Sequence, residues 1–188
     1  MNIFTGRAAA VATAIALLAL SGRAMAAEET YNDEEIAKAA SSFFSTGAKE
    51  LSDVLHKVLK DKGEPVAIIR GEEAGGAIGV GLRYGRGELE FKGGAKQLVY
   101  WQGPSIGFDV GANAVKVFTL VYKLPDAKSL FKRFASAEGS LYFVGGFGVN
   151  YLQAGSVSLA PVRFGVGWRQ GINLGYLKFT AEKTINPL

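Results

Sequence analysis

The chain has 188 residues, of which 48% are hydrophobic and 20% charged, with a formal net charge of +4 and no cysteine. This small charge, without a run of basic residues, argues against a nucleic-acid-binding protein. The lack of cysteine excludes disulfides, thiol catalysis and cysteine metal ligands, so stability must come from packing in a single domain.

Residues 1–26 have the organisation of a secretory signal peptide. Arg7 supplies a positive n-region, an apolar run covers 8–20, and the small-x-small triplet at 24–26 fits a cleavage site. The apolar run is shorter than the ~20 residues that a membrane-spanning helix needs. We therefore expect cleavage before Ala27 and export to the periplasm.

An amphipathic helix is predicted over residues 33–61. Asn32 is a favourable N-cap, acidic residues follow it, and Pro65 prevents continuation beyond the end. Apolar residues recur at helical spacing, at Ile36, Ala40, Phe43, Phe44, Leu51, Val54, Leu55, Val58 and Leu59. Gly47 falls on the same stripe, so the pattern favours one long helix over two, although the sequence at 45–47 could break it.

Beyond the helix the periodicity becomes that of strands. We assign residues 27–64 to an N-terminal amphipathic helix and residues 65–188 to a glycine-rich β-barrel. Ten strands are predicted, at 66–71, 77–84, 88–92, 97–101, 105–112, 115–122, 140–149, 156–159, 163–169 and 174–180. A short helix over 126–134 interrupts the series.

This succession of strands indicates an all-β fold, and 25 glycines allow the coiling that a small barrel requires. We predict a small soluble β-barrel of about eight strands, with the N-terminal helix packed against it or plugging one mouth. A transmembrane barrel is the alternative. The charged helix and several strands shorter than ~9–11 residues argue against it.

A glycine–arginine pattern occurs twice, at residues 79–85 and 165–171. In each copy three glycines and one arginine, Arg83 or Arg169, share one face of the strand, opposite larger side chains. Asp109 occupies the matching face of a third strand. Two interpretations remain open: an internal Arg–Asp ion pair, or an anionic-ligand site in which Asp109 balances one arginine. Arg83, Asp109 and Arg169 are thus the candidate ligand-binding residues.

The sequence contains no recognisable catalytic motif. The single histidine, His56, lies off the apolar stripe of the helix and is interpreted as a solvated surface residue. The acid pairs Glu72/Glu73 and Glu88/Glu90 are interpreted as exposed strand residues. No residues have metal-ligand or nucleotide-loop spacing. We predict a non-enzymatic protein without metal or cofactor.

Several stretches together resemble the EipA family of periplasmic envelope-integrity proteins. The matching stretches are Gly71-Glu72-Glu73-Ala74-Gly75-Gly76-Ala77, Gly81-Leu82-Arg83-Tyr84-Gly85, Tyr100-Trp101-Gln102-Gly103-Pro104-Ser105, Gly107-Phe108-Asp109-Val110-Gly111, Tyr142-Phe143-Val144-Gly145-Gly146-Phe147-Gly148 and Asn173-Leu174-Gly175-Tyr176-Leu177-Lys178-Phe179-Thr180. The resemblance implies an eight-stranded periplasmic barrel with a role in envelope integrity. It implies no catalytic residues.

A weaker likeness covers residues 103–134, which are similar to SYLF-type lipid-binding domains. As an analogy it favours a lipid ligand. The leading hypothesis is a protein that supports the envelope, by binding a lipid or lipid-linked glycan and with peripheral rather than integral membrane association. The alternative is a structural or protein-interaction module whose barrel is filled by its own side chains.

Overall fold

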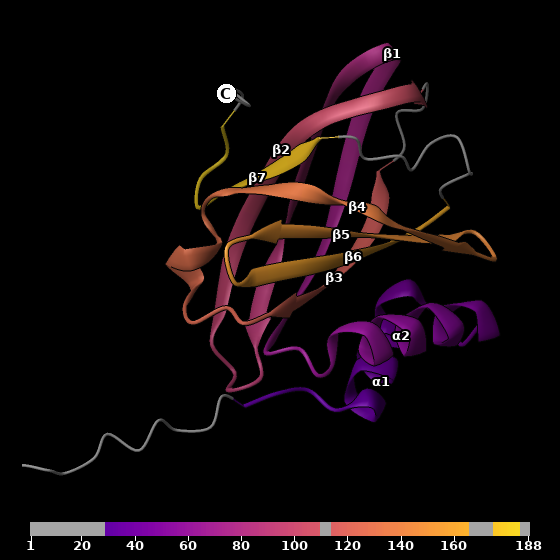
Figure 1. The fold of residues 1–188 in the computed structure, drawn as a ribbon, viewed down its shortest axis with the longest axis vertical. Coiled ribbons are helices and arrows are strands. Elements are labelled where there is room, and N and C mark those ends of the chain that lie inside the picture. The colour runs from indigo at the N-terminus through magenta and orange to yellow at the C-terminus, as the bar shows by residue number, and fades with distance from the viewer. Residues whose placement is uncertain (1–28, 110–113, 166–174, 185–188) are drawn as a thin grey trace, which may run out of the picture.

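A computed structural model describes residues 29–109, 114–165 and 175–184 (Figure 1). The predicted signal peptide lies outside these residues. The strands form a closed antiparallel barrel in the order β1-β2-β7-β4-β5-β6-β3. The elements that build it are β1 (Ala67–Phe91), β2 (Lys96–Asp109), β3 (Val115–Tyr122), β4 (Arg133–Val144), β5 (Phe147–Ala154), β6 (Val157–Phe164) and β7 (Tyr176–Thr180).

The strand β1 enters the barrel twice, so that the described part of the chain supplies eight strand segments. Its first part, Ala67 to Glu73, pairs with β3, and its second part, Ala77 to Glu90, pairs with β2. Figure 1 shows β1 rising to one end of the barrel and turning back. Beyond its two ends, the amide of Lys92 donates to the carbonyl of Val66 at 3.0 Å. The eight-stranded barrel expected from the sequence is therefore confirmed.

Two helices precede the barrel, α1 (Asp33–Phe44) and α2 (Lys49–Lys62), where the sequence favoured one long helix. That prediction is wrong because the chain turns at Ser45. This residue has a left-handed backbone with φ of 58°, and its amide donates to the carbonyls of Ser41 and Ser42. The N-cap predicted at Asn32 is confirmed, and Asn32 forms a capping box with Glu35.

Several predicted strand boundaries are also wrong. The first three predicted strands fall in β1, and the next two fall in β2 as far as Asp109, because the glycine-rich segments between them remain in the sheet. The predicted strand 140–149 is interrupted by a turn in which Gly145 and Gly146 have φ of 53° and 82°. The short helix predicted over 126–134 is only one turn of 3-10 helix, Ala127–Leu130. Phe134 lies in β4 instead and is fully buried.

The helices pack on the outer wall formed by β3, β5 and β6, and Figure 1 shows them together on that side of the barrel. Side chains of β3 alternate between two cores. Phe118 and Leu120 pack with the helices, whereas Val117 and Val121 belong to a second core. Because the helices lie outside, this second core is the interior of the barrel. It consists of Val66, Ala67, Ile69, Leu89, Val99, Trp101, Val117, Val121, Leu124, Leu130, Phe134, Leu152, Val157, Leu159, Leu177 and Phe179.

Candidate functional site

A charged cluster is buried inside the barrel, beside the apolar core. The carboxylate of Glu73, from the first part of β1, accepts from Nε of Arg163 at 2.6 Å and from Nη2 of the same side chain at 3.3 Å. Nη1 of Arg83, from the second part of β1, lies 3.4 Å from the same carboxylate. All three residues are at least 93% buried, with exposed fractions of 7%, 7% and 4% for Glu73, Arg83 and Arg163.

Neutral groups complete this cluster. The indole N–H of Trp101 donates to Glu73 Oε2 at 3.0 Å. Arg163 also donates through Nη1 to the side-chain oxygen of Asn150 at 2.8 Å, and Nε of Arg83 donates to the carbonyl of Pro104 at 3.2 Å. The carboxylate therefore connects β1, β2 and β6 across the inside of the barrel.

The electrostatics of the cluster keep Glu73 ionised. Burial by itself raises the pKa of a carboxyl group, because it removes water from the charged form. The positive charges of Arg163 and Arg83, with the hydrogen bonds from Arg163 and Trp101, outweigh burial and lower the pKa of Glu73 to about 2. A carboxylate with this pKa does not take up or release protons near neutral pH.

Glycines of β1 make room for the Trp101 indole. A Cβ atom added at Gly85 would lie 2.0 Å from Cε2 of this ring, and one added at Gly71 would lie 2.6 Å from its Cη2 atom. The two glycines belong to the two parts of β1, so the indole fits against both. Arg83 lies on the same face as Gly85, while Leu82 and Tyr84 on the opposite face are 40% and 36% exposed. For Arg83 and Gly85, the inward orientation predicted from the glycine–arginine pattern is confirmed.

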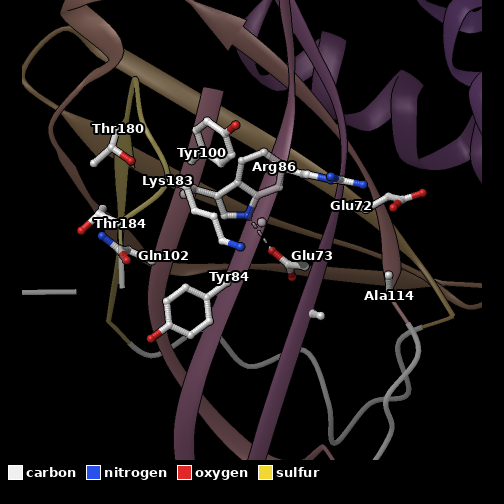
Figure 2. Close-up of a pocket in the computed structure, with 13 residues that line it drawn as sticks. Glu72, Glu73, Tyr84, Arg86, Tyr100, Gln102, Ala114, Thr180, Lys183 and Thr184 are labelled. Atoms are coloured by element: carbon white, nitrogen blue, oxygen red, sulfur yellow. Dashed lines mark hydrogen bonds between the residues drawn. The ribbon is translucent and has the colours of Figure 1, made fainter. Parts of the chain in front are cut away.

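A cleft with a volume of about 660 Å³ opens beside Trp101 and the cluster (Figure 2). This volume lies within the ~300–1,000 Å³ typical of sites for small ligands. Its walls come from β1, β2, the residue before β3, the end of β7 and the segment that follows it. The lining residues are Glu72, Glu73, Ala74, Tyr84, Gly85, Arg86, Tyr100, Trp101, Gln102, Ala114, Thr180, Lys183 and Thr184.

Both aromatic and polar groups line this cleft. Tyr84, Tyr100 and Trp101 supply flat apolar surfaces. Gln102 and Lys183 add an amide and an ammonium group. Such a lining suits a ligand with both an apolar and a polar part.

Of the three predicted site residues, the structure describes the side chain of Arg83 alone. It is buried, and its Nη1 lies 3.4 Å from the carboxylate of Glu73, a residue that the sequence did not indicate as a partner. The side chain of Asp109 and the whole of Arg169 lie outside the described part of the molecule, so their pairing stays a prediction. In the second glycine–arginine copy, Gly165 has a left-handed φ of 81° and follows the end of β6.

The sequence interpretation missed the main acid and one of the two described arginines of the cluster. Glu73 was expected to be exposed, and that expectation is wrong, whereas its neighbour Glu72 is exposed. The available signal was alternation, because Ile69, Gly71 and Glu73 must share one strand face. Arg163 likewise lies four residues after Leu159 in β6, so the two share a strand face, and both face the interior.

The other acids and the histidine lie away from the cluster. Glu88 is exposed and pairs with Lys96 at 3.0 Å, while Glu90 is half-buried and pairs with Arg70. His56 is exposed on α2, as expected. Within the described residues, no group of three or more His, Asp or Glu side chains could hold a metal ion.

The fold and the site together define a small antiparallel β-barrel protein with a helix-covered wall and a lateral cleft. The chain belongs to the EipA family, described as envelope integrity protein A, whose family model matches residues 29–188. It is similar to the crystal structure of a β-barrel-like uncharacterized protein from Brucella abortus, with 39% sequence identity and a TM-score of 0.78. That similarity covers 85% of this chain and 99% of the Brucella chain. A search of curated proteins finds no match.

Proposed function

We propose that this protein is a non-enzymatic periplasmic protein that supports the cell envelope by binding a lipid or a lipid-linked glycan. The observation that carries this proposal is the cleft of about 660 Å³ beside Trp101, with its aromatic walls and polar rim. Membership of the envelope integrity protein A family supports the envelope role. The cleft supports the choice of ligand, because an amphiphile presents an apolar and a polar part to the same site.

The ligand is proposed to bind in the cleft and not in the centre of the barrel. The centre is occupied by large side chains, of which Phe134, Leu89 and Leu159 are completely buried. An eight-stranded barrel is just wide enough to be filled in this way. This filled interior is also the observation that supports a second candidate function, a structural or protein-interaction module without a ligand.

The chemistry of the cluster supports a binding role over an enzymatic one. A general acid or base works best with a pKa near the working pH. Glu73, the buried acid of the cleft, has a pKa of about 2 and is already held by two arginines. His56 lies on α2, which packs on the wall formed by β3, β5 and β6, whereas the cleft is lined from β1 and β2.

Peripheral association with the membrane is supported by the covered wall. A bilayer-spanning barrel exposes apolar residues to lipid all around and has strands of ~9–11 residues. Here the outer residues Phe118, Leu120 and Val162 are covered by helices, and β7 has 5 residues. No helix in the described part of the chain is long and apolar enough to cross a membrane.

Native mass spectrometry of protein purified from its own periplasm tests the proposal. A co-purifying lipid or lipid-linked glycan, lost when Tyr84 and Tyr100 are both replaced by alanine, is the expected result. A double variant at the exposed residues Lys38 and Lys60 is the control and should retain the ligand. Protein that is always empty, together with a specific envelope protein captured by cross-linking, would instead establish the interaction module.

A further inference from the structure

The charges around the cleft are not equivalent. Glu73 is held by Arg163 and Arg83 at distances of 2.6 and 3.4 Å, so its negative charge is offset within the barrel. Glu72 and Arg86 are exposed residues of opposite sign on the two parts of β1. Figure 2 shows both side chains directed away from the middle of the cleft.

Lys183 differs from these residues in position and in pairing. It lies on the short segment after β7, and this segment also contributes Thr184 to the wall of the cleft, next to Thr180 at the end of β7. In Figure 2 its side chain extends over the cleft with the ammonium group toward the middle. No ion pair within the described residues involves Lys183, whereas Lys96 and Lys92 on the β1–β2 hairpin are both paired with glutamates.

We propose that Lys183 binds the anionic group of the ligand, a phosphate or a carboxylate, while the adjoining part of the ligand lies against Tyr84 and Trp101. A lysine ammonium binds phosphate as a compact point charge with three donors. The offset charge of Glu73 leaves this ammonium as the charge that a ligand meets in the middle of the cleft. The inference rests on the proposed function and specifies its ligand as an anionic amphiphile.

Two sources could supply this chemistry, a phospholipid headgroup or an acidic sugar of a glycan. Calorimetric titration of the mature protein with four probes separates them: dihexanoyl phosphatidic acid, glucose 1-phosphate, glucuronate and, as a neutral reference, glucose. We expect at least one anionic probe to bind more tightly than glucose. A preference for the lipid phosphate or for the acidic sugars then identifies the source.

The variant Lys183→Met tests the residue itself. It should weaken binding of the anionic probe about tenfold or more, which is the loss expected for one charge-assisted hydrogen bond, and Lys183→Arg should largely restore binding. Lys60→Met, at an exposed position on α2, removes the same charge far from the cleft and should have no effect. Because Lys183 is exposed, the variant should melt like the parent protein.

The outcomes separate this inference from the proposed function. If an amphiphile co-purifies and Lys183→Met retains it as well as the parent protein does, the role of Lys183 is overturned and the binding function stands. Equal affinity for glucose and for the anionic probes would likewise overturn the role of Lys183 and leave the binding function standing. If no probe binds and native protein is empty, both the binding function and the inference are overturned.

Discussion

At the scale of single residues, Glu73 is the group on which the interior of the barrel depends. Its carboxylate accepts hydrogen bonds from Arg163 and Trp101 and faces the guanidinium of Arg83. Taking three charges out of water is costly, and the cost is recovered only while the opposite charges remain together. Removal of the acid leaves two buried guanidinium groups facing a neutral side chain.

We therefore expect Glu73→Gln to lower the free energy of unfolding by roughly 3–5 kcal/mol, which is typical for breaking a buried charge pair. Chemical denaturation at pH 7 measures this loss. Glu72→Gln is the matched control, because the neighbouring residue carries the same charge but is exposed. It should change stability by less than ~0.5 kcal/mol. Equal effects of the two substitutions would contradict the assigned role of Glu73.

The same cluster predicts how stability depends on pH. The pKa of Glu73 falls from about 4.5 to about 2 on folding, so the unfolded chain binds the proton more readily. The contribution of this group is complete above about pH 4.5 and is lost as pH falls toward 2. It amounts to about 3 kcal/mol. The difference in stability between the parent protein and Glu73→Gln should therefore shrink over this acidic range.

The sequence predicts this site only in part. Strand alternation places Arg83 on the inward glycine face, because a single strand fixes which side chains share a face. The contact between Arg83 and Glu73 depends on how β1 folds back, because the fold brings together two residues that are ten positions apart. Arg163 joins from β6, and no local pattern encodes that approach. The interpretation of Glu73 as exposed followed from its charge and neglected its position in the alternation.

At the scale of elements, the two helices and the barrel wall form one apolar layer. Phe44, at the end of α1, is 7% exposed. The centroid of its ring lies 5.4 Å from the ring centroid of Phe147 and 6.4 Å from that of Phe118. Leu51 and Leu55 of α2 are also buried. The apolar stripe was predictable from helical spacing. The break at Ser45 was not, because the stripe continues in phase through it.

Phe44→Ala should lower the free energy of unfolding by about 3 kcal/mol, since it removes a buried aromatic ring and leaves a cavity between helix and wall. His56→Ala, at an exposed position on α2, is the control and should have little effect. Urea denaturation followed by circular dichroism measures both. A loss below 1 kcal/mol for Phe44→Ala would mean that the helices contribute little to the stability of the barrel.

At the scale of the whole molecule, the covered wall and the open cleft lie on different sides of the barrel. The helices cover β3, β5 and β6, whereas the cleft is lined mainly from β1 and β2. Closure of the strands removes exposed sheet edges. The barrel therefore presents this cleft on a side that the helices leave open, and its sequence signals were the strand spacing and the glycine content.

The last prediction concerns where the whole protein resides. Because residues 1–26 have the pattern of a cleaved signal peptide, the mature protein should begin at Ala27 and be released in a periplasmic extract, as N-terminal mass spectrometry and fractionation can test. Replacing both Ala24 and Ala26 by leucine removes the small residues of the cleavage site, and this variant should remain membrane-bound as an uncleaved precursor. Parent protein found solely in detergent extracts of the outer membrane, with heat-modifiable migration, would favour a transmembrane barrel instead.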